Sequence, residues 1–594
     1  MPNDARALPR WDMTSVYPGL QSPEFTQALR RVIADIDALT ELFAAYHIER
    51  RDVAPPGDDI VRPFETVVER YNSVLAETWA VSGYITCHLN TNSRDALAHS
   101  LSCQLQQHAM LDFIPPRFSL LYARFAAWVG SFDVDALIER SDIARAHAFA
   151  LRKAHRQARR AMTSVEEDLA AALSLSGSTA WWSLYNTLTS QRARPDRVTD
   201  RGDRVSRARA YEEDRASWEE IAVPLAAALN GIKGTVTTLA MRRGWASPLD
   251  AALFDHDIDR AVLDAMLVAV RAALPDFRRY LRAKARALGV PTLAWYDLDA
   301  PLGPASMAWE FDDAACLVGE QFVAFSPRMG ALAARAFRER WIDAEPRDGK
   351  QGGGSCMLLR GGESRILLNY TPTFGGVCAL AHELGHAYHN SVLADRTMLQ
   401  RAIPMTLAET ASAFCETLVR QERLRHGGDR AELAATLDEW LQAACWYVVD
   451  NTAAFLFEQG VFEERQRGEL SVDELKTLMR QAQVDTYGDA VDPATLNLYA
   501  WANSDPLYQT SVSFYNIPYT FGLLFGLGLY ARYRADPEGF RAGYDDLLAA
   551  TGSDDTATVA ARFGIDIRTP DFWREGLAVI RADIDRFEDL LATV

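Results

Sequence analysis

The chain has 594 residues, 48% of them hydrophobic, with a formal net charge of −18 at pH 7 and seven cysteines. This length can bury a large core and allows several domains. The negative charge repels phosphate backbones, so we expect no nucleic-acid partner. An odd number of scattered cysteines indicates free thiols in a reducing compartment, and we therefore expect a cytoplasmic protein.

The N-terminal part of the chain is predicted to be helical. Apolar residues recur at three- and four-residue spacing over residues 24–54, 64–112 and 134–173, and prolines and glycines interrupt the pattern between these segments. Met1–Arg6 leads into polar sequence without an apolar stretch of signal-peptide length, so nothing predicts export. The basic run Arg152–Arg160 alternates with alanine at helical spacing and is most simply a solvated helix face.

A polar stretch over residues 191–209 contains seven arginines and no apolar run, as is typical of a domain boundary or an exposed connection. We therefore predict a helical N-terminal region over residues 1–200 and a larger helical region over residues 201–594. Short strands are predicted within the larger region, near residues 319–325 and 355–370.

A metal-binding motif follows these strands in His382-Glu383-Leu384-Gly385-His386. Two histidines four apart on a helix face one ion, and the glutamate between them is positioned to polarise a water molecule. Apolar and small neighbours indicate burial, and buried paired histidines need a partner, which a metal supplies. Gly385 costs about 1 kcal/mol relative to alanine inside a helix, which indicates close packing behind the metal. The pattern predicts half of a catalytic zinc site and hydrolysis of an amide.

The third ligand is expected in the next predicted helix, which runs from Pro404 to Glu416. A catalytic zinc site has three protein ligands and one open position. Glu409 and Glu416 are seven residues apart and so share one helix face. We predict that Glu409 is the ligand and that Glu416 accepts the other ring proton of a ligand histidine. A solvated helix face is the alternative for Glu416.

With these residues assembled, the chain resembles the thimet oligopeptidase and oligoendopeptidase F family of zinc metallopeptidases, on the oligoendopeptidase F branch. The resemblance rests on the histidine motif, on Glu409, Ser412 and Glu416, and on the supporting segments Gly177–Trp181, Trp295–Leu298, Glu363–Tyr370 and Phe514–Gly522. It implies a mainly α fold with two helical lobes, a deep central channel and a small β-sheet beside the metal-binding helix. It also implies short, unstructured peptides as substrates.

Ile366–Leu368 is the apolar run of the second strand segment. An exposed edge strand at this place could hold an extended peptide through backbone hydrogen bonds without reading its sequence. A hairpin that merely covers the metal-binding helix is the alternative. The resemblance favours the first interpretation, because in the family this strand lines the substrate cleft.

A zinc peptidase usually adds a hydrogen-bond donor for the oxyanion of the transition state. No histidine follows His426, so the candidates are Tyr508, Tyr515 and Tyr519. The family commonly has His-Phe-Tyr near this point, whereas this chain has Pro506-Leu507-Tyr508. Tyrosines at helical spacing are more often core residues, and only the resemblance raises Tyr515 and Tyr519 as donors.

The sequence thus predicts a zinc-dependent metalloendopeptidase with one Zn²⁺ per chain, bound by His382, His386 and Glu409. Glu383 would act as the general base on water activated by the metal and would then protonate the leaving amine. The alternatives are a helical zinc carboxypeptidase or dipeptidase, a metal- or peptide-binding protein without turnover, and a hydrolase of non-peptide amides or esters. The longest uncharged stretch, residues 509–530, contains hydroxyls, glycines and Pro518, so it is predicted to be a buried helix and not a membrane span.

Overall fold

The computed structural model describes residues 8–51, 58–108, 116–192, 203–302, 308–426 and 428–592. Met1–Arg6, the predicted boundary at residue 200 and most of the polar stretch around it lie outside the described residues. The division of the chain at that point stays a prediction.

Helices dominate both predicted regions, and several of them begin at a residue whose side chain caps the N-terminus. The capping box of Thr163 and Glu166, for example, opens α8. In the first half of the chain the helices are α1 (Pro23–Ala45), α2 (Asp58–Thr91), α3 (Ala96–His108), α4 (Pro116–Val129), α5 (Val134–Arg140), α6 (Asp142–Ala146), α7 (Ala148–Ala158), α8 (Ser164–Ser176), α9 (Ser178–Gln191), α10 (Arg204–Arg242), α11 (Pro248–Asp255) and α12 (Arg260–Ala287), followed by the 3₁₀ turn η1 (Trp295–Asp297).

The second half contains the sheet and the remaining helices. These elements are α13 (Phe311–Phe325), α14 (Pro327–Arg338), β1 (Ile342–Asp343), β2 (Gly354–Leu358), β3 (Ser364–Leu368), α15 (Phe374–Val392), α16 (Met405–Ala408), α17 (Thr410–His426), α18 (Arg430–Cys445), the π-helical turn η2 (Trp446–Asp450), α19 (Asn451–Glu464), η3 (Arg465–Arg467), α20 (Val472–Tyr487), η4 (Gly488–Ala490), η5 (Pro493–Thr495), α21 (Asp505–Tyr508), α22 (Asn516–Ala535), α23 (Pro537–Ala550), α24 (Thr556–Arg562) and α25 (Pro570–Ala592).

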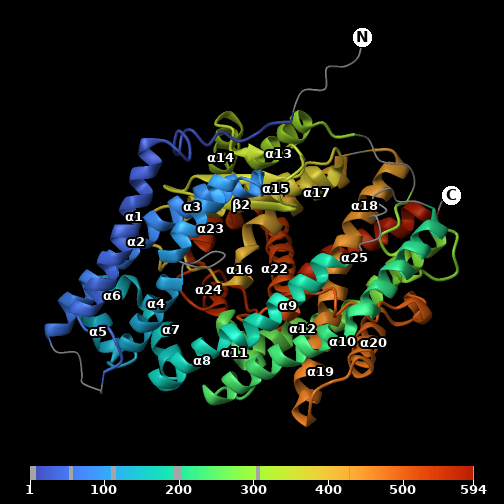
Figure 1. Cartoon of the computed structure of the whole chain (residues 1–594). Coiled ribbons are helices and arrows are strands. Elements are labelled where there is room, and N and C mark those ends of the chain that lie inside the picture. The colour runs from blue at the N-terminus through green and yellow to red at the C-terminus, as the bar shows by residue number, and fades with distance from the viewer. Residues whose placement is uncertain are drawn as a thin grey trace.

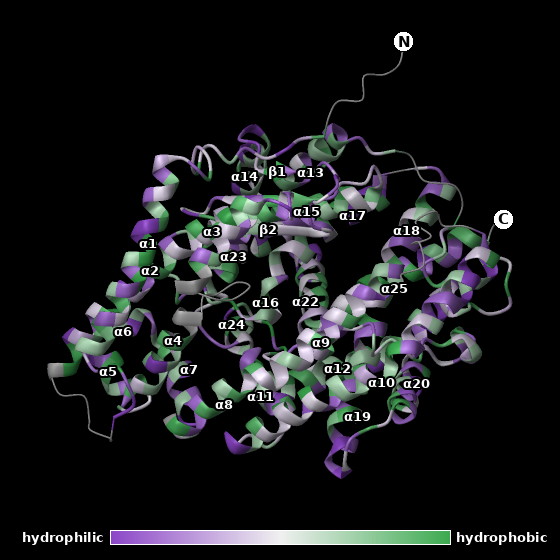
Figure 2. Cartoon of the chain, viewed as in Figure 1, coloured by the Kyte–Doolittle hydropathy of each residue, from purple (hydrophilic) through white to green (hydrophobic). Residues whose placement is uncertain are grey.

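The mainly helical fold class with a small sheet beside the metal-binding helix is confirmed. Figure 1 shows α1–α7 at the left, α9–α12 with α19 and α20 across the lower middle and lower right, and α13–α15 and α17 at the top beside β2. Helix α22 descends through the middle and packs against α17 and α25. Hydrophobic and hydrophilic residues share the same helices throughout, as amphipathic packing requires (Figure 2).

The sheet has the order β1-β3-β2, with β1 parallel and β2 antiparallel to β3. Ile366–Leu368 therefore lies in the central strand, and the interpretation of this run as an edge strand is wrong. The edge beside the metal-binding helix is β2, in which Cys356 pairs with Ile366. β3 is buried along its whole length because it is covered on both sides, which explains its continuous apolar pattern.

The strand predicted near residues 319–325 is also wrong, because this segment is the end of helix α13. Its buried residues Val318, Phe322 and Phe325 follow the spacing of a helix face. The prediction failed because a short apolar run does not distinguish a strand from one side of a helix.

Three clusters of buried apolar residues hold the elements together. One cluster lies among the N-terminal helices, and Leu359 and Leu399 of the second predicted region also belong to it. Another joins Tyr185 on α9 and residues of α10 to α19–α21. The largest surrounds α12, α15, α17, α22 and α25 and forms the rigid base of the site described below.

Helix α22 occupies most of the long uncharged stretch and is buried over nearly its whole length, as predicted. Across the described residues, the search for a helix with the length and apolarity needed to span a bilayer finds none.

Candidate metal centre

Helix α15 carries the two histidines and the glutamate of the motif. Thr373 caps its N-terminus by accepting a hydrogen bond from the backbone N–H of Gly376. The rings of His382 and His386 lie side by side, with centroids 5.0 Å apart. Within the described ranges, the one group of three residues whose ligand atoms could hold a metal ion is His382, His386 and Glu409, all within 4.8 Å of one another.

Glu409 reaches the histidines from a break between two helices. The predicted second helix is interrupted at this residue, because α16 ends at Ala408, α17 begins at Thr410, and Glu409 itself has φ −88° and ψ 5°. Its Oε2 lies 3.1 Å from His382 Nε2 and 3.3 Å from His386 Nε2. Burial raises the pKa of Glu409, but hydrogen bonds from His382 and His386 outweigh burial and hold the pKa well below its usual range.

A hydroxyl fixes the carboxylate of Glu409. Ser412 Oγ donates to Glu409 Oε2 at 2.7 Å from the first turn of α17. The carboxylate of Glu409 is therefore held toward α15, where it meets the two histidines.

Glu416 lies behind the histidines and not beside Glu409. Its Oε2 is 3.2 Å from His382 Nδ1, and its Oε1 accepts from Arg420 Nη1 at 2.7 Å. The guanidinium of Arg420 in turn stacks 3.4 Å from the centre of the Trp440 ring. This chain of contacts is suited to fix the orientation of the His382 ring, the role predicted for Glu416.

Glycines allow the helices of the site to approach one another closely. A Cβ on Gly385 would lie 2.7 Å from the Cα of Ser412 and 2.8 Å from the backbone oxygen of Ala411. On the other side, a Cβ on Gly522 of α22 would lie 2.6 Å from the Cβ of Glu409. The glycine of the motif therefore permits the contact between α15 and α17, in agreement with the close packing expected from the sequence.

Gly385→Ala should destabilise the protein by ~1–3 kcal/mol, the usual cost of overpacking, because the added methyl group meets backbone atoms. It should also weaken metal binding by separating α15 from α17. Gly319→Ala in α13 is the matched control, since nothing lies within 4 Å of the added Cβ. Urea unfolding should show a loss for Gly385→Ala and no loss for Gly319→Ala; equal curves would contradict the packing argument.

Glu383 is buried, with 7% of its surface exposed, and none of the described residues donates a hydrogen bond to its Oε2. Burial raises its pKa. The edge strand passes directly over this carboxylate, because a Cβ on Gly354 of β2 would lie 2.6 Å from Glu383 Oε1. A buried carboxylate without a donor is an arrangement that a water molecule or a substrate proton would satisfy.

Tyr515 is the N-cap of α22, and Tyr519 lies in the first turn of this helix, near Glu409. Their rings meet edge to face with centroids 5.3 Å apart. Burial raises the pKa of Tyr519, as do Tyr515 and Glu409, so this hydroxyl stays protonated and able to donate.

The residue before Tyr515 has an unusual backbone conformation. Phe514 adopts φ +56°, in the left-handed region that bulky residues rarely enter. Its N–H donates to Glu458 Oε2 at 3.1 Å, and the carboxylate of Glu458 is paired with the buried Lys233 of α10. The left-handed turn at Phe514 is thus held by a buried ion pair, and it stands immediately before Tyr515 and the start of α22.

Tyr508 is placed differently. Its side chain is fully buried and stacks on Tyr185, with ring centroids 3.9 Å apart, and its hydroxyl has no hydrogen-bond partner among the described residues. Pro506, at the position where the family commonly has histidine, lies in the same short helix α21. This geometry favours Tyr515 and Tyr519 over Tyr508 as donors.

Several residues near the site were not identified from the sequence. They are Arg420, Trp446, Tyr447 and Glu458. The spacing of four residues between Glu416 and Arg420 was the available signal for that pair.

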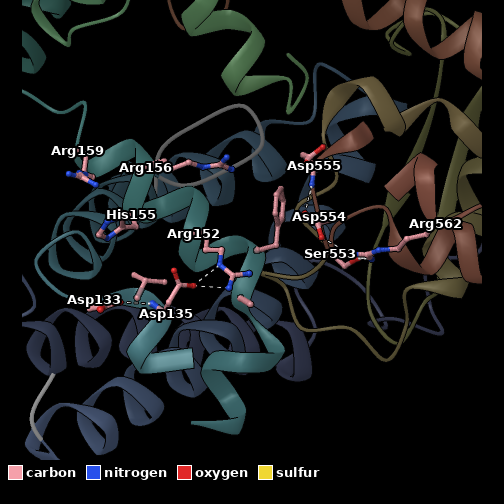
Figure 3. Close-up of a pocket in the computed structure, with 13 residues that line it drawn as sticks. Asp133, Asp135, Arg152, His155, Arg156, Arg159, Ser553, Asp554, Asp555 and Arg562 are labelled. Carbon is pink, nitrogen blue, oxygen red and sulfur yellow. Dashed lines mark hydrogen bonds and ion pairs between the residues drawn. The ribbon is translucent and has the colours of Figure 1, made fainter. Parts of the chain in front are cut away.

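A separate pocket of about 650 Å³ lies between α5, α7 and the turn before α24 (Figure 3). Arg152, Arg156 and Arg159 of the basic run line it, so the run forms a pocket wall as well as a helix face. Arg152 is paired with Asp135, and Arg562 with Asp554 on the opposite wall. None of the predicted site residues lines this pocket.

The comparisons with known proteins agree with the geometry of the site. Residues 323–579 match the model of peptidase family M3. An oligoendopeptidase F homolog of Lactococcus lactis is 25% identical over 354 residues, which are 59% of this chain and 58% of that protein. The group B oligopeptidase of Streptococcus agalactiae is 25% identical over 398 residues, 66% of each chain. The chain thus aligns with less than two thirds of the length of these curated relatives.

Solved structures match almost the whole chain. A crystal structure from Chlamydophila abortus has a TM-score of 0.78 at 19% identity and covers 98% of each chain. The oligoendopeptidase-F of Enterococcus faecium has a TM-score of 0.68 at 16% identity, over 96% of this chain and 98% of that one. The fold is therefore shared along the chain, and the resemblance seen in the motifs is confirmed: the chain is similar to peptidase family M3 over residues 323–579 and to proteins of the oligoendopeptidase F branch.

Proposed function

We propose that the protein is a zinc-dependent metalloendopeptidase that hydrolyses internal peptide bonds of short oligopeptides. The convergence of His382, His386 and Glu409 beside the buried Glu383 supports this most directly. Such a set of two imidazoles and one carboxylate is typical of catalytic zinc sites and leaves a coordination position open.

The residues present fit one Zn²⁺ per chain. The unpartnered oxygen of Glu383 beside three convergent donors is what a hydrolytic metal site requires. When bound, zinc would supply Lewis acidity that acidifies water and polarises the scissile carbonyl. His382, His386 and Glu409 would hold the ion, and Glu416 would fix the His382 ring through Nδ1.

Glu383 supplies the proton transfers in this proposal. Its carboxylate takes a proton from the attacking water and returns it to the leaving amine, with no covalent intermediate. Burial beneath Gly354 excludes bulk water from the carboxylate and keeps its pKa raised, which makes the protonated form accessible for the second transfer.

Tyr515 and Tyr519 are proposed as donors to the oxyanion. Tyr515→Phe or Tyr519→Phe should lower kcat by ~10²-fold for the residue that donates, the usual effect of removing one such donor. The metal content should not change. Tyr530→Phe on the same helix is the control, because its hydroxyl accepts from Arg425 instead. Normal kcat in both test variants would place the donor elsewhere.

The edge strand β2 supports a peptide as the substrate. An extended chain laid along β2 would form backbone hydrogen bonds and bring a carbonyl over Glu383. Such recognition does not read side chains and suits short unstructured peptides. The cysteines are all free in the structure, which supports the cytoplasm as the compartment.

The experiment that tests the function is cleavage of an internally quenched oligopeptide blocked at both ends, with a chelator control, metal add-back and location of the cut by mass spectrometry. We expect internal cleavage that the chelator abolishes and zinc restores. A carboxypeptidase or dipeptidase would leave this peptide intact. A zinc-loaded protein that cleaves neither blocked nor free peptides would support a binding role and contradict the proposal.

A further inference from the structure

A row of aromatic side chains leads from the metal centre to the protein surface. Trp446 packs edge to face on Tyr447, with ring centroids 4.8 Å apart, and on Tyr519, at 5.5 Å. Tyr519 continues to Tyr515, at 5.3 Å. The row therefore joins the proposed oxyanion donors, Tyr515 and Tyr519, to Trp446, which stands 73 positions before Tyr519 in the sequence.

Trp446 is exposed to an unusual degree for its type. It has 47% of its surface accessible, while Trp181, the next most exposed tryptophan among the described residues, has 36%. Two tyrosine rings support one part of the indole, and the rest is uncovered. Exposed large aromatic surface next to a catalytic centre is a common property of binding sites, since burial of an aromatic ligand on it releases water.

A local distortion of the backbone brings Trp446 to this place. Residues Trp446–Asp450 form a π-helical turn between α18 and α19. Such turns insert one residue into a helix, change the direction of the side chains and occur frequently at functional sites. A regular α-helix through this segment would present a different residue beside Tyr519.

The π-helical turn is fixed by side chains. Thr520 Oγ1 donates to the backbone oxygen of Tyr447 at 2.7 Å, which ties the turn to α22. Asn451 Nδ2 donates to the backbone oxygen of Trp446 at 3.1 Å. The backbone that carries the indole is therefore fixed before a ligand arrives. Less conformational entropy of the protein is lost when a ligand packs against the ring.

The aromatic row also lies close to the reacting groups. Burial raises the pKa of Tyr447, and so do the carboxylates of Glu416, Glu409 and Glu383, which are near enough to interact with its hydroxyl. Glu416 is already paired with Arg420, and Glu409 faces both histidines. Since Glu416 and Glu409 are engaged, and Glu383 is buried beneath Gly354, the chemistry left for a substrate side chain at the row is apolar and not cationic.

We propose that Trp446, Tyr447 and Tyr519 form the wall of a subsite that binds a large apolar or aromatic side chain of the peptide, next to the bond that is cut. This inference rests on the proposed peptidase function and names the substrate class for the same site. Backbone pairing with β2 would hold any peptide, and the aromatic subsite would decide which bond is placed over the metal.

The test uses doubly blocked, quenched peptides that differ only in one residue flanking the cut, either Phe or Ala. The protein should favour Phe at one flanking position by ~10-fold in kcat/KM, the scale of a buried aromatic contact. Trp446→Ala should remove most of this preference while kcat/KM for the Ala peptide stays within about 2-fold. Trp446→Phe should retain it, and Tyr46→Ala at the C-cap of α1 is the exposed-aromatic control.

Two outcomes would overturn the subsite: an unchanged Phe preference in Trp446→Ala, or an equal loss for both peptides. Calorimetric binding of the same peptides to Glu383→Gln protein and to its Trp446→Ala derivative separates this proposal from the proposed function, because binding needs no turnover. Tighter binding of the Phe peptide that depends on Trp446 would support the subsite even if no peptide were cleaved. Equal affinities with and without the indole would contradict it even if cleavage occurred.

Discussion

Glu383→Gln should lower kcat by at least ~10²-fold, the scale expected when a general base is removed, while the protein keeps its zinc. Glutamine has nearly the same shape but cannot take a proton from water. The three ligand atoms lie on other side chains, so their arrangement should survive the change. The amide would also occupy the buried position beneath Gly354 without a net charge.

Metal content by mass spectrometry and kcat on a blocked peptide measure the two halves of this expectation. Glu320→Gln on the exposed face of α13 controls for the loss of one negative charge. Activity near that of the unchanged protein would show that another group takes the proton. Loss of zinc together with activity would instead assign Glu383 a structural role.

Glu409→Ala should abolish stoichiometric zinc binding and activity together. This residue supplies a carboxylate oxygen that lies 3.1 Å from His382 Nε2 and 3.3 Å from His386 Nε2. Its removal leaves two ligands, which is too few for a stable catalytic site. Glu416→Ala should keep the three ligands and weaken zinc affinity by ~10–100-fold, as is typical when the partner of a ligand histidine is lost.

The two variants can be compared by metal content after dialysis against a graded series of chelator concentrations, with circular dichroism to confirm folding. We expect Glu409→Ala to be metal-free at every step and Glu416→Ala to lose metal only at the higher concentrations. The reverse order would identify Glu416 as the true ligand and would overturn the assignment made from the sequence.

The core of the site was predictable because its residues follow one another at helical spacing. His382, Glu383 and His386 occupy a single helix, Glu409 stands immediately before the next helix and Glu416 lies within it, so helical spacing predicted which of these side chains share a face. The break at Glu409 was not predictable, since it depends on how α16 packs against α22 around Gly522.

Features that depend on long-range contacts were missed. Whether a strand is central or at an edge depends on its partners, and β1 lies more than 20 residues before β3. The π-helical turn at Trp446 has no sequence signature and is stabilised by Thr520 from a distant helix. The burial of Tyr508 likewise follows from its stacking on Tyr185, a residue of the first predicted region.

The pairing of Lys233 with Glu458 limits how this protein can be shortened. A recombinant fragment cut at the limits of the family match, residues 323–579, would begin inside α13 and would omit α10. Glu458 would then keep its buried position near Phe514 without a counter-charge, at a cost of ~3–5 kcal/mol. A stable fragment should therefore extend at least to the start of α10, far upstream of the segment that matches the family model.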